Sequence, residues 1–561
     1  MPPKAKRLGI DGVFDIETQD WVIFVLGGCY SESDGYREFR SLPAMVEYMR
    51  ERGGTWWAHN GGRYDFLALF DVIPPEVPIQ CNMAGSRVIS ARIGKLELRD
   101  SYCIAPMRLA QFAGICGERK AEVGLPCECT KNCGGYCAIK REMSSERYAL
   151  LSGYLREDCR VLHESLSTWL GYIRDHYGEP TGTIGGTSWR VCGGEETSLS
   201  PAHYAFARRG YYGGRTEVYR PRSSRGWHDD INSAYVHALT LPMPVGPASE
   251  AYCTIPRTAK RYVAEAIVLI DDALVPPLPY RTDNRLYYPT GRLFGVWTDI
   301  ELRQPGVRVE SIGRVLYWEA EDYPYADYCL RGWELRKQAG KSSVLGKLNK
   351  SLLVSLAGKL AQRPETKTIR RSPDIQTEPW FQVGNSIEWY YRETFRLSKC
   401  ANVHHAGAMT AHVRTVLGAR LRASPSPVYC DTDSSFSEVD LPLGRGAELG
   451  EWNPEGEYRD FRALAPKLYS YWEGGSRHTR EKGFPRNSFD ELSAGGAVTI
   501  EAGVLGLTGA VRKNKGEVFL RNISTRRHNP VTGWIGGRLI DGEATRPPTI
   551  DEVEQRERRK R

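Results

Sequence analysis

The sequence predicts a mixed α/β protein built from several packed modules, and three observations support this class. The chain has 561 residues, which suits roughly three to five modules of about 100–200 residues each. Its composition, 41% hydrophobic and 26% charged, is that of a globular protein and excludes a largely disordered chain. Strand-like alternation over residues 8–27 is followed by helical periodicity over 41–52, 145–175 and 326–362.

The same sequence argues against a membrane or secreted protein. The longest apolar run, Trp21 to Gly28, is too short to cross a bilayer, and no apolar segment follows the basic start MPPKAKR. We therefore expect neither a membrane span nor a signal peptide. Fourteen cysteines in so long a chain favour a reducing cytosol over a disulfide scaffold. The net charge of +8 permits a nucleic-acid partner without demonstrating one.

Local signals predict the remaining elements in chain order. Residues 8–27 form a strand pair with a turn near Gln19 and Asp20, and Ser144 and Ser145 offer an N-cap to the second helix. The Gly/Pro/Thr-rich segment 178–200 is expected to be a linker. Residues 326–362 are expected to form two antiparallel helices. The tail from Glu501 should hold short strands and end in a mobile basic segment, RERRKR.

A first set of acidic residues lies in the N-terminal third. Asp15 and Glu17 stand two apart on a predicted strand, so both carboxylates lie on one face. Asp65 follows in the segment HNGGRYD, and Tyr154 and Asp158 stand four apart on one helix face. Like charges gathered in this way are best tolerated when a cation binds them. Four acids and a tyrosine could hold two divalent ions and an attacking water.

A second set lies in the C-terminal half. In the segment YCDTDS at 429–434, Asp431 and Asp433 share a face at a predicted hairpin, and Asp230 ends another predicted strand in the segment DINSAY. Carboxylates of this kind bind metal ions that bridge a triphosphate, which fits nucleotidyl transfer.

Lysines accompany the second set. Six of them fall between residues 337 and 367, and four lie near one side of what reads as a continuous helical pattern: Lys337, Lys341, Lys347 and Lys350. A solvated helix face is the simpler interpretation. A stripe of ammonium groups also suits a polyanion such as a triphosphate.

Taken in order, these motifs resemble those of family B DNA polymerases that carry a proofreading exonuclease. The matching segments are DIET, HNGGRYD, YLRED, YYGG, DINSAY, the lysine-rich helix and YCDTDS. Three further segments resemble motifs of the protein-primed branch found in phages and linear plasmids: TAHVR at 410–414 (T-x-x-A/G-R), KLY at 467–469 (K-x-Y) and YYGG at 211–214 (Y-x-G-G/A). The resemblance covers about residues 10–550.

The resemblance implies a fold and its boundaries. It implies an α/β multidomain protein in which an RNase H-like exonuclease domain precedes a right-hand polymerase of palm, fingers and thumb with two insertions. The first insertion resembles the region that docks a terminal protein and duplex DNA, and the second resembles the region that supports processivity and strand displacement. The implied boundaries are exonuclease 1–184, palm 185–245 and 399–500, first insertion 246–325, fingers 326–362, second insertion 363–398, and thumb with basic tail 501–561.

It also implies roles in the exonuclease site. Mg²⁺ ions, or Mn²⁺ as a substitute, would be held by Asp15, Glu17, Asp65 and Asp158, with Tyr154 orienting the water. Contacts with the single-stranded 3′ end are implied for Thr18, Asn60, Tyr64 and Ser101. Tyr102 replaces the leucine that usually follows Ser101, so its own contact is in doubt.

In the polymerase site, Asp230 and Asp433 would be the main metal ligands, with Asp431 a weaker partner and the Ile231 carbonyl an additional one. Tyr235 would exclude a ribonucleotide 2′-hydroxyl, and Lys350, aided by Lys337 and Lys347, would bind the triphosphate. The remaining implied DNA contacts are Tyr211, Gly213, Gly214, Thr410, Arg414, Lys467 and Tyr469. One motif departs from the family: K-x-x-x-N-S-x-Y-G has Val354 for Asn and Ala357 for Tyr, which affects expected fidelity and nucleotide affinity.

Four cysteines cluster within 11 residues: Cys127, Cys129, Cys133 and Cys137. Their spacing could wrap a structural Zn²⁺, and a loop of free thiols is the alternative.

The interpretation is a DNA polymerase that replicates a phage or plasmid genome in a bacterial cytoplasm as a monomer. Its expected partners are template and primer DNA, dNTPs and a terminal protein acting as primer. The alternatives are a family B polymerase that uses ordinary nucleic-acid primers or none, and a non-catalytic DNA-binding relative. The intact carboxylates argue against the last of these.

Overall fold

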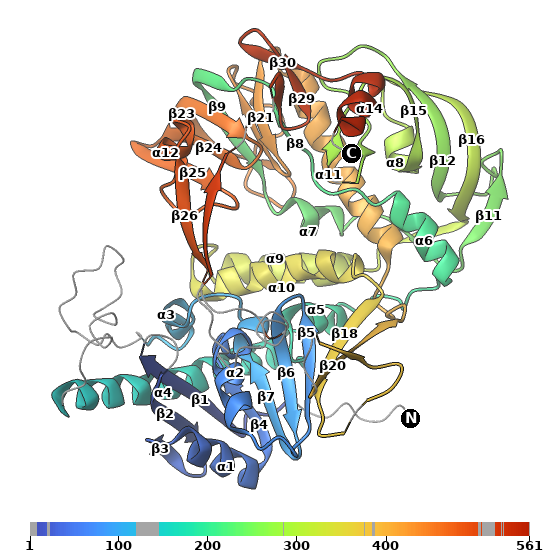
Figure 1. The fold of residues 1–561 in the computed structure, drawn as a ribbon. Coiled ribbons are helices and arrows are strands. Elements are labelled where there is room, and N and C mark those ends of the chain that lie inside the picture. Colours follow the sequence, from blue (N-terminus) through green and yellow to red (C-terminus); the bar gives the residue numbers. More distant parts are fainter. Residues whose placement is uncertain are drawn as a thin grey trace.

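The computed structural model spans the chain and describes most of its residues. These are residues 8–19, 23–118, 145–283, 285–374, 376–383, 388–502, 507, 522–528, 530 and 532–559. The described part forms two masses joined through a pair of central helices, with the N-terminal domain below and the remaining domains above in Figure 1.

The N-terminal domain is built on a ten-stranded sheet in the order β19-β20-β18-β5-β6-β7-β4-β1-β2-β3. The predicted strand pair is confirmed, because β1 pairs antiparallel with β2. β1 also runs parallel to β4, and β4 runs parallel to β7. The bounds are β1 Gly12–Gln19, β2 Ile23–Ser31, β3 Gly35–Phe39, β4 Gly54–Ala58, β5 Ile79–Ala84, β6 Arg87–Ile93 and β7 Leu96–Asp100.

Helices cover this sheet. The helix predicted over 41–52 is α1, and the one predicted over 145–175 is α4, whose buried stripe packs on β1 and β2. The stripe follows the 3.6-residue period, with Leu151, Leu155, Leu162 and Trp169 among its buried members. The helical bounds are α1 Leu42–Arg52, η1 Gly61–Arg63, α2 Asp65–Val72, η2 Ser101–Cys103, α3 Leu109–Phe112, η3 Ala113–Ile115 and α4 Ser145–His176.

Three strands of this sheet come from a segment far along the chain. They are β18 Glu365–Arg371, β19 Phe381–Gln382 and β20 Trp389–Phe395, all within the predicted second insertion. β18 pairs antiparallel with β5, placing Ile369 opposite Cys81. The buried Arg371 side chain donates to the Phe70 and Ile73 carbonyls at the end of α2. The second insertion is therefore part of the N-terminal sheet and not a separate body (Figure 1).

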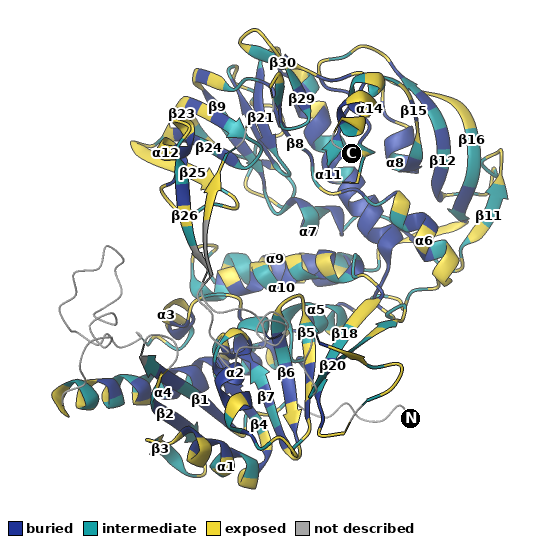
Figure 2. Cartoon of the chain, in the orientation of Figure 1, coloured by how far each residue is buried: buried dark blue, intermediate teal, exposed yellow. Residues whose placement is uncertain are grey.

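A seven-stranded antiparallel sheet forms the palm, in the order β25-β24-β23-β9-β22-β21-β8. Its core is aromatic, with Tyr429, Phe436, Tyr458 and Phe461 buried together. The central strands are buried and the edge strand β25 is exposed (Figure 2). The bounds are β8 Thr216–Val218, β9 Arg222–Ile231, β21 Pro427–Asp431, β22 Ser434–Ser437, β23 Trp452–Ala465, β24 Leu468–Glu473, β25 Ser476–Glu481, α7 Ala234–Ala238 and α11 Val403–Ala423.

Two helices, α9 Ala326–Gln338 and α10 Val344–Leu360, form the fingers between the two masses. The predicted helix pair is confirmed, and the Ser343 side chain caps α10 by accepting from the Gly346 amide. The helices approach closely, because a Cβ added to Gly332 would lie 2.4 Å from the Leu353 side chain. The pattern is not one continuous helix, since residues 339–343 form a turn and Lys341 lies in it.

The predicted linker over 178–200 is wrong in part. It contains α5 Ile184–Val191, which packs against α10, and the Thr183 side chain caps this helix. α6 Pro201–Arg209 follows, capped by Ser200. Thr183 therefore acts as the cap of α5, and Gly185, Gly186 and the buried Thr187 lie within this helix.

The first insertion forms a four-stranded sheet in the order β11-β16-β12-β15, with its own buried cluster around Trp297 and Tyr262. The bounds are β10 Met243–Val245, β11 Ser249–Tyr252, β12 Arg261–Ile270, β13 Tyr280–Arg281, β14 Leu286–Tyr287, β15 Gly291–Thr298, α8 Asp299–Leu302, β16 Val307–Trp318 and β17 Ala320–Asp322.

The C-terminal region holds the expected short strands, but its end differs from the prediction. Part of the segment expected to be mobile lies in a helix that ends at Arg558, with a capping box between Thr549 and Glu552. This T-x-x-E signal was readable in the sequence. The bounds are α12 Phe489–Ser493, β26 Ala497–Ala502, β27 Asn522–Arg527, β28 Trp534–Ile535, β29 Arg538–Asp541, β30 Ala544–Arg546 and α14 Ile550–Arg558.

Candidate functional site

The structure brings the N-terminal acids together. Asp15 and Glu17 extend from β1 toward Asp158 on α4, and carboxylate oxygens of the three lie within 4.8 Å of one another. Asp65 begins α2 nearby, and burial followed by the charge of Asp15 raises its pKa well above the usual value. A divalent cation would offset this repulsion, and carboxylate oxygens are the ligands that Mg²⁺ prefers. These residues therefore fit a metal site.

Of the residues predicted to contact the 3′ end, Thr18 and Tyr64 lie beside this cluster. The Thr18 and Tyr64 hydroxyls form a hydrogen bond, and Tyr154 lies half-buried one helical turn before Asp158. Asn60 is exposed, with a left-handed φ of 66°. Ser101 is fully buried and its hydroxyl bonds to His59 Nδ1 at 2.9 Å. A direct DNA contact of the Ser101 side chain stays a prediction.

The second acid set forms at the centre of the palm sheet. The β21–β22 hairpin places Ser434 opposite Asp230, and the Ile231 amide donates to the Asp433 carbonyl at 2.8 Å. Burial and the charge of Asp433 raise the pKa of Asp230 to about 8. Burial also raises the pKa of Asp433, opposed by the charge of Lys350. Paired acids that resist ionisation in the absence of metal are expected of a metal site.

The tight hairpin explains one glycine of the YYGG motif. Thr432 has a left-handed φ of 67°, and its amide donates to the Arg215 carbonyl at 2.7 Å. A Cβ on Gly214 would lie 2.7 Å from the Thr432 side chain, so this position has no room for any other residue. A Cβ added to Gly213 would have no neighbouring atom within 4 Å. Gly214 thus allows the chain to pass behind the β21–β22 hairpin.

Two lysines approach the palm acids. Lys350 on α10 is exposed, and its positive charge partly offsets the rise in the pKa of both Asp230 and Asp433. Lys467 forms an ion pair with Asp431. The cationic residues therefore come from the fingers and from the turn between β23 and β24.

The other predicted lysines lie differently. Lys337 pairs with Glu334 at 2.9 Å and with Glu448 at 3.1 Å, and Lys341 donates to the Ala447 carbonyl. Lys347 is exposed. The phosphate-binding roles of Lys337 and Lys347 stay predictions.

One candidate functional residue was not predicted from the sequence. Arg336 on α9 donates to the Ser233 hydroxyl at 3.0 Å, linking the fingers to the turn that follows Asp230. Nothing in the sequence distinguishes this arginine from the many others, because the contact joins segments about a hundred residues apart.

Tyr235 lies half-buried in the first turn of α7, packed against the main core. Burial and then the charge of Asp433 raise the pKa of its hydroxyl to about 12, so the ring lies beside the palm acids. On α10, Val354 is 36% exposed and Ala357 is buried, one and two turns beyond Lys350.

Arg414 and Thr410 on α11 are buried. Arg414 pairs with the buried Glu301 at 2.6 Å and donates to the Tyr212 and Gly213 carbonyls at 2.6 and 2.8 Å. The Thr410 hydroxyl donates to the Ala406 carbonyl. Arg414 thus holds the YYGG loop against the first insertion. This supports an indirect role, and its predicted contact with DNA stays a prediction.

A cavity of about 460 Å³ opens on the palm acids. It is lined by Lys467, Tyr469, His478 and Arg480 together with Asp230, Asp431 and Asp433. A neighbouring cavity of about 610 Å³ shares Lys467 and is lined by four further basic side chains and no carboxylate: Arg285, Lys482, His528 and Arg556.

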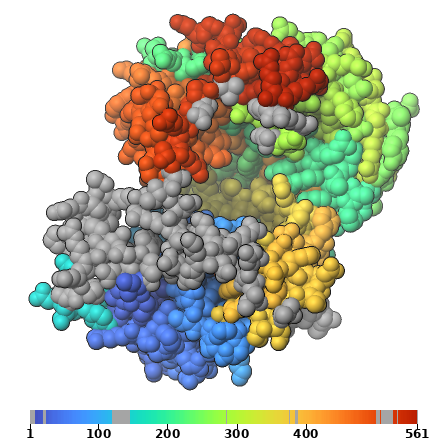
Figure 3. Space-filling model, in the orientation of Figure 1, coloured from blue at the N-terminus to red at the C-terminus, as the bar shows by residue number. Residues whose placement is uncertain are grey.

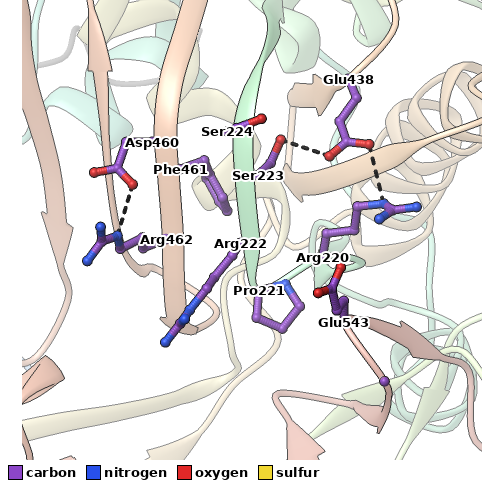
Figure 4. A pocket seen from close by; sticks show the side chains of 11 residues that line it. Arg220, Pro221, Arg222, Ser223, Ser224, Glu438, Asp460, Phe461, Arg462 and Glu543 are labelled. Atoms are coloured by element: carbon purple, nitrogen blue, oxygen red, sulfur yellow. Dashed lines mark hydrogen bonds and ion pairs between the residues drawn. The ribbon is translucent and has the colours of Figure 1, made fainter.

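The largest of these cavities, about 660 Å³, lies at the other end of β9 (Figure 4). Ser223 donates there to Glu438 at 3.0 Å, and Arg462 pairs with Asp460 at 3.0 Å. Asp230 lies eight positions along β9 from Arg222, a distance of about 26 Å at the usual rise per residue. None of the predicted site residues lines this cavity.

The cysteine cluster at 127–137 lies outside the described residues, so the zinc prediction is not tested. The described cysteines are free thiols. Among the helices of the described ranges, none combines the length and apolarity needed to cross a membrane.

The palm sheet carries paired acids and faces finger helices that bear lysines. A second domain with its own acid cluster is joined to it. This arrangement is the fold of polymerases that carry an exonuclease domain. The chain belongs to the type B DNA polymerases of organelles and viruses, whose family model matches residues 138–433. The predicted fold class and family are thereby confirmed.

Individual proteins agree with this family. A DNA-directed DNA polymerase of Enterobacteria phage PRD1 is 25% identical over 452 residues, which cover 74% of this chain and 73% of that protein. The Phi29 DNA polymerase ternary complex with primer-template DNA and nucleotide superposes with a TM-score of 0.72 at 14% identity, covering 92% of this chain and 98% of that one. The Phi29 polymerase complexed with single-stranded DNA gives a TM-score of 0.66 at 13% identity, covering 89% and 98%.

Proposed function

We propose that the chain is a DNA-directed DNA polymerase that adds dNTPs to a primer and removes nucleotides from a 3′ end at its N-terminal site. One observation carries the proposal. Two acid clusters form on two different sheets: Asp230 and Asp433 in the palm, and Asp15, Glu17 and Asp158 in the N-terminal domain. Each cluster has the ligand type that two-metal phosphoryl chemistry requires.

In the palm, Asp230 and Asp433, with the Ile231 carbonyl, would hold Mg²⁺ or Mn²⁺. When bound, the metal would activate the primer 3′-hydroxyl and stabilise charge on the leaving pyrophosphate. Lys350 lies on the fingers side of these acids and would bind the triphosphate oxygens. Lys467 would steady the primer terminus from the position where it now pairs with Asp431. Tyr235 would lie under the sugar.

In the N-terminal domain, Asp15, Glu17, Asp65 and Asp158 would hold the metal that activates a water. Tyr154 stands one turn from Asp158 on the same helix and would orient that water. Thr18, Asn60 and Tyr64 would bind the single-stranded 3′ end.

The basic cavity beside the palm supports binding of DNA. Its cationic side chains, Arg285, Lys467, Lys482 and Arg556, come from the palm, the first insertion and the C-terminal region, and the lining contains no carboxylate. Such a lining attracts a phosphate backbone. The surface is also hollowed between the palm and the gold strands β18 and β20, with the fingers at the back (Figure 3). We assign template and primer to this hollow.

We further propose that replication by this chain is protein-primed, processive and strand-displacing, and that it takes place as a monomer in a bacterial cytoplasm. The separately folded sheet of the first insertion, residues 249–318, supports a dedicated docking surface for a terminal protein. The pairing of β18 with β5 fixes the second insertion to the N-terminal sheet, which supports its role in holding the template during processive synthesis.

Primer extension on a circular single-stranded template with Mg²⁺, without accessory proteins, tests the polymerase. Products longer than the circle would support processive strand displacement. Deoxynucleotidylation of a candidate terminal protein tests the priming. Extension of DNA primers without any protein-primed product would favour the alternative of ordinary primers, and no extension at all would contradict the proposed function.

A further inference from the structure

Arg87, a residue with no assigned role, contacts both Asn60, which is predicted to bind the 3′ end, and Tyr102, which follows the predicted ligand Ser101. It begins β6, and its Nη2 donates to Asn60 Oδ1 at 2.8 Å. Its Nη1 forms an ion pair with Asp100. Its guanidinium carbon lies 4.6 Å from the centre of the Tyr102 ring. One arginine therefore joins the loop of Asn60 to the turn of Tyr102.

The surrounding contacts hold the Arg87 side chain in one position. Asp100 is fully buried and also accepts from the Gly62 and Tyr102 amides at 3.3 and 3.0 Å. A Cβ on Gly62 would lie 1.8 Å from the Val88 carbonyl oxygen, so this loop packs directly on β6. Arg87, with a side chain only 12% exposed, is held on one side by Asp100 and presents its other donors to Asn60.

The contact determines which end of the Asn60 amide faces outward. A guanidinium carries donors only, so the Asn60 oxygen must accept from Arg87. The two Nδ2 hydrogens are then left for a ligand. Asn60 is exposed and adopts a left-handed φ of 66°, which asparagine tolerates better than most residues. This orientation makes Asn60 a hydrogen-bond donor.

We propose that Arg87 is a positioning residue for the exonuclease substrate. It orients Asn60 as a donor to an acceptor oxygen or nitrogen on the single-stranded 3′ end, and it holds the Tyr102 ring as a surface on which a base stacks. The inference rests on the proposed exonuclease function. It accounts for the tyrosine at 102. The guanidinium of Arg87 forms a cation–π interaction with an aromatic ring, and an aliphatic side chain would have no such interaction.

The test is degradation of a 5′-labelled single-stranded oligonucleotide over a range of concentrations with Mg²⁺. For Arg87→Ala we expect KM to rise about tenfold or more, with kcat close to that of the wild type, because substrate contacts are lost and the metal acids are untouched. Arg87→Lys should behave similarly, since an ammonium cannot span Asp100 and Asn60 while stacking on Tyr102. A KM within about twofold of wild type for both variants would overturn the proposal.

Three further variants separate positioning from folding and from charge. Arg92→Ala removes an exposed arginine of the same strand and should leave KM unchanged. Asn60→Asp keeps an acceptor for Arg87 but has no amide hydrogens, so it should raise KM as Asn60→Ala does. Wild-type affinity in Asn60→Asp would overturn the donor assignment.

Primer extension by the same preparations is the folding control. If Arg87→Ala loses primer extension as well, the test uses the double variant Arg87→Lys with Asn60→Ala, and its KM for the single strand is measured. If Arg87 acts through Asn60, the double variant should be no worse than Asn60→Ala apart from the loss at Tyr102, and full additivity would contradict the proposal. A wild-type chain that extends primers but degrades no single strand would contradict the proposed exonuclease instead.

Discussion

At the residue scale, Asp433 separates the two proposed activities. It belongs to the palm hairpin and has no contact with the N-terminal acids. Removing a ligand of a two-metal site costs several kcal/mol of transition-state stabilisation, so Asp433→Ala should lower nucleotide addition by about a thousandfold or more. Degradation of single strands should persist. Primer extension and degradation assays on one preparation check this, and near-normal extension would contradict the assignment.

Tyr235 is the residue that we expect to exclude ribonucleotides. Its ring lies half-buried beside Asp433, where the sugar of an incoming nucleotide would meet it. Tyr235→Val should raise ribonucleotide use relative to deoxynucleotide use by about a hundredfold, because the overlap with a 2′-hydroxyl is removed. The discrimination ratio from single-nucleotide competition is the measurement. If the tyrosine only fills the core, both substrates should be used less well and the ratio should not change.

Asp230 should make the metal-free protein sensitive to pH. Its pKa is raised from 3.8 to about 8 in the folded protein, so folding favours the protonated carboxyl. The stability it contributes is full below about pH 4 and is lost as the pH rises to about 8. Asp230→Asn, which stays neutral, should therefore exceed the wild type at pH 8 by on the order of 2 kcal/mol, with little difference at pH 4.

Urea unfolding in EDTA at the two pH values measures this difference. The exposed Asp271→Asn is the control, and it should shift stability little at either pH. The difference in the free energy of unfolding between Asp230→Asn and the wild type should grow as the pH rises. A difference that grows as the pH falls would contradict the raised pKa.

At the element scale, α4 links the two sites. Its first half carries Tyr154 and Asp158, and its end holds the fingers through the buried Asn349, which precedes Lys350. Tyr177 donates to Asn349 Oδ1 at 2.7 Å, and Asn349 Nδ2 donates to the Tyr172 hydroxyl at 3.1 Å. The fingers are thus anchored to the N-terminal domain by buried hydrogen bonds.

We expect Asn349→Leu to weaken this anchor. The buried Tyr177 hydroxyl and the half-buried Tyr172 hydroxyl would lose their partner, at a cost of about 1–3 kcal/mol in the free energy of unfolding. Because Lys350 follows directly, KM for dNTP should rise while the rate of single-strand degradation changes little. Ser351→Ala, whose hydroxyl bonds only within its own helix, is a matched control. Unchanged KM for dNTP would show that the anchor does not position the fingers.

At the scale of the whole molecule, the two proposed active sites lie in halves that share one large buried core, and each half also has a buried cluster of its own. The N-terminal sheet has its own buried cluster, and the palm aromatic cluster is distinct from it. Asp15→Ala combined with Glu17→Ala should therefore abolish excision of a mismatched 3′ end and preserve extension. Continued excision by this variant would show that these acids are not the exonuclease ligands.

Much of the site was predictable from local pattern. Asp15 and Glu17 alternate on a strand, and Asp431 and Asp433 flank a tight hairpin, so their shared faces follow from backbone periodicity alone. The capping box at Thr549 and Glu552 was equally legible, although the prediction there was a mobile end. Arg336, Arg87 and Asn349 were not predictable, since each acts through a partner distant in the chain.

The sequence by itself determined the family, the order of the motifs, the main helices and the acids that would bind metal, because these depend on residue type and short spacing. Only the tertiary structure decided which segments share a sheet and which polar groups are buried. It joined β18 to β5 across almost three hundred residues, enclosed Arg414 behind the YYGG loop, and placed Arg87 beneath Tyr102. Such contacts arise from packing between distant segments, which no local pattern encodes.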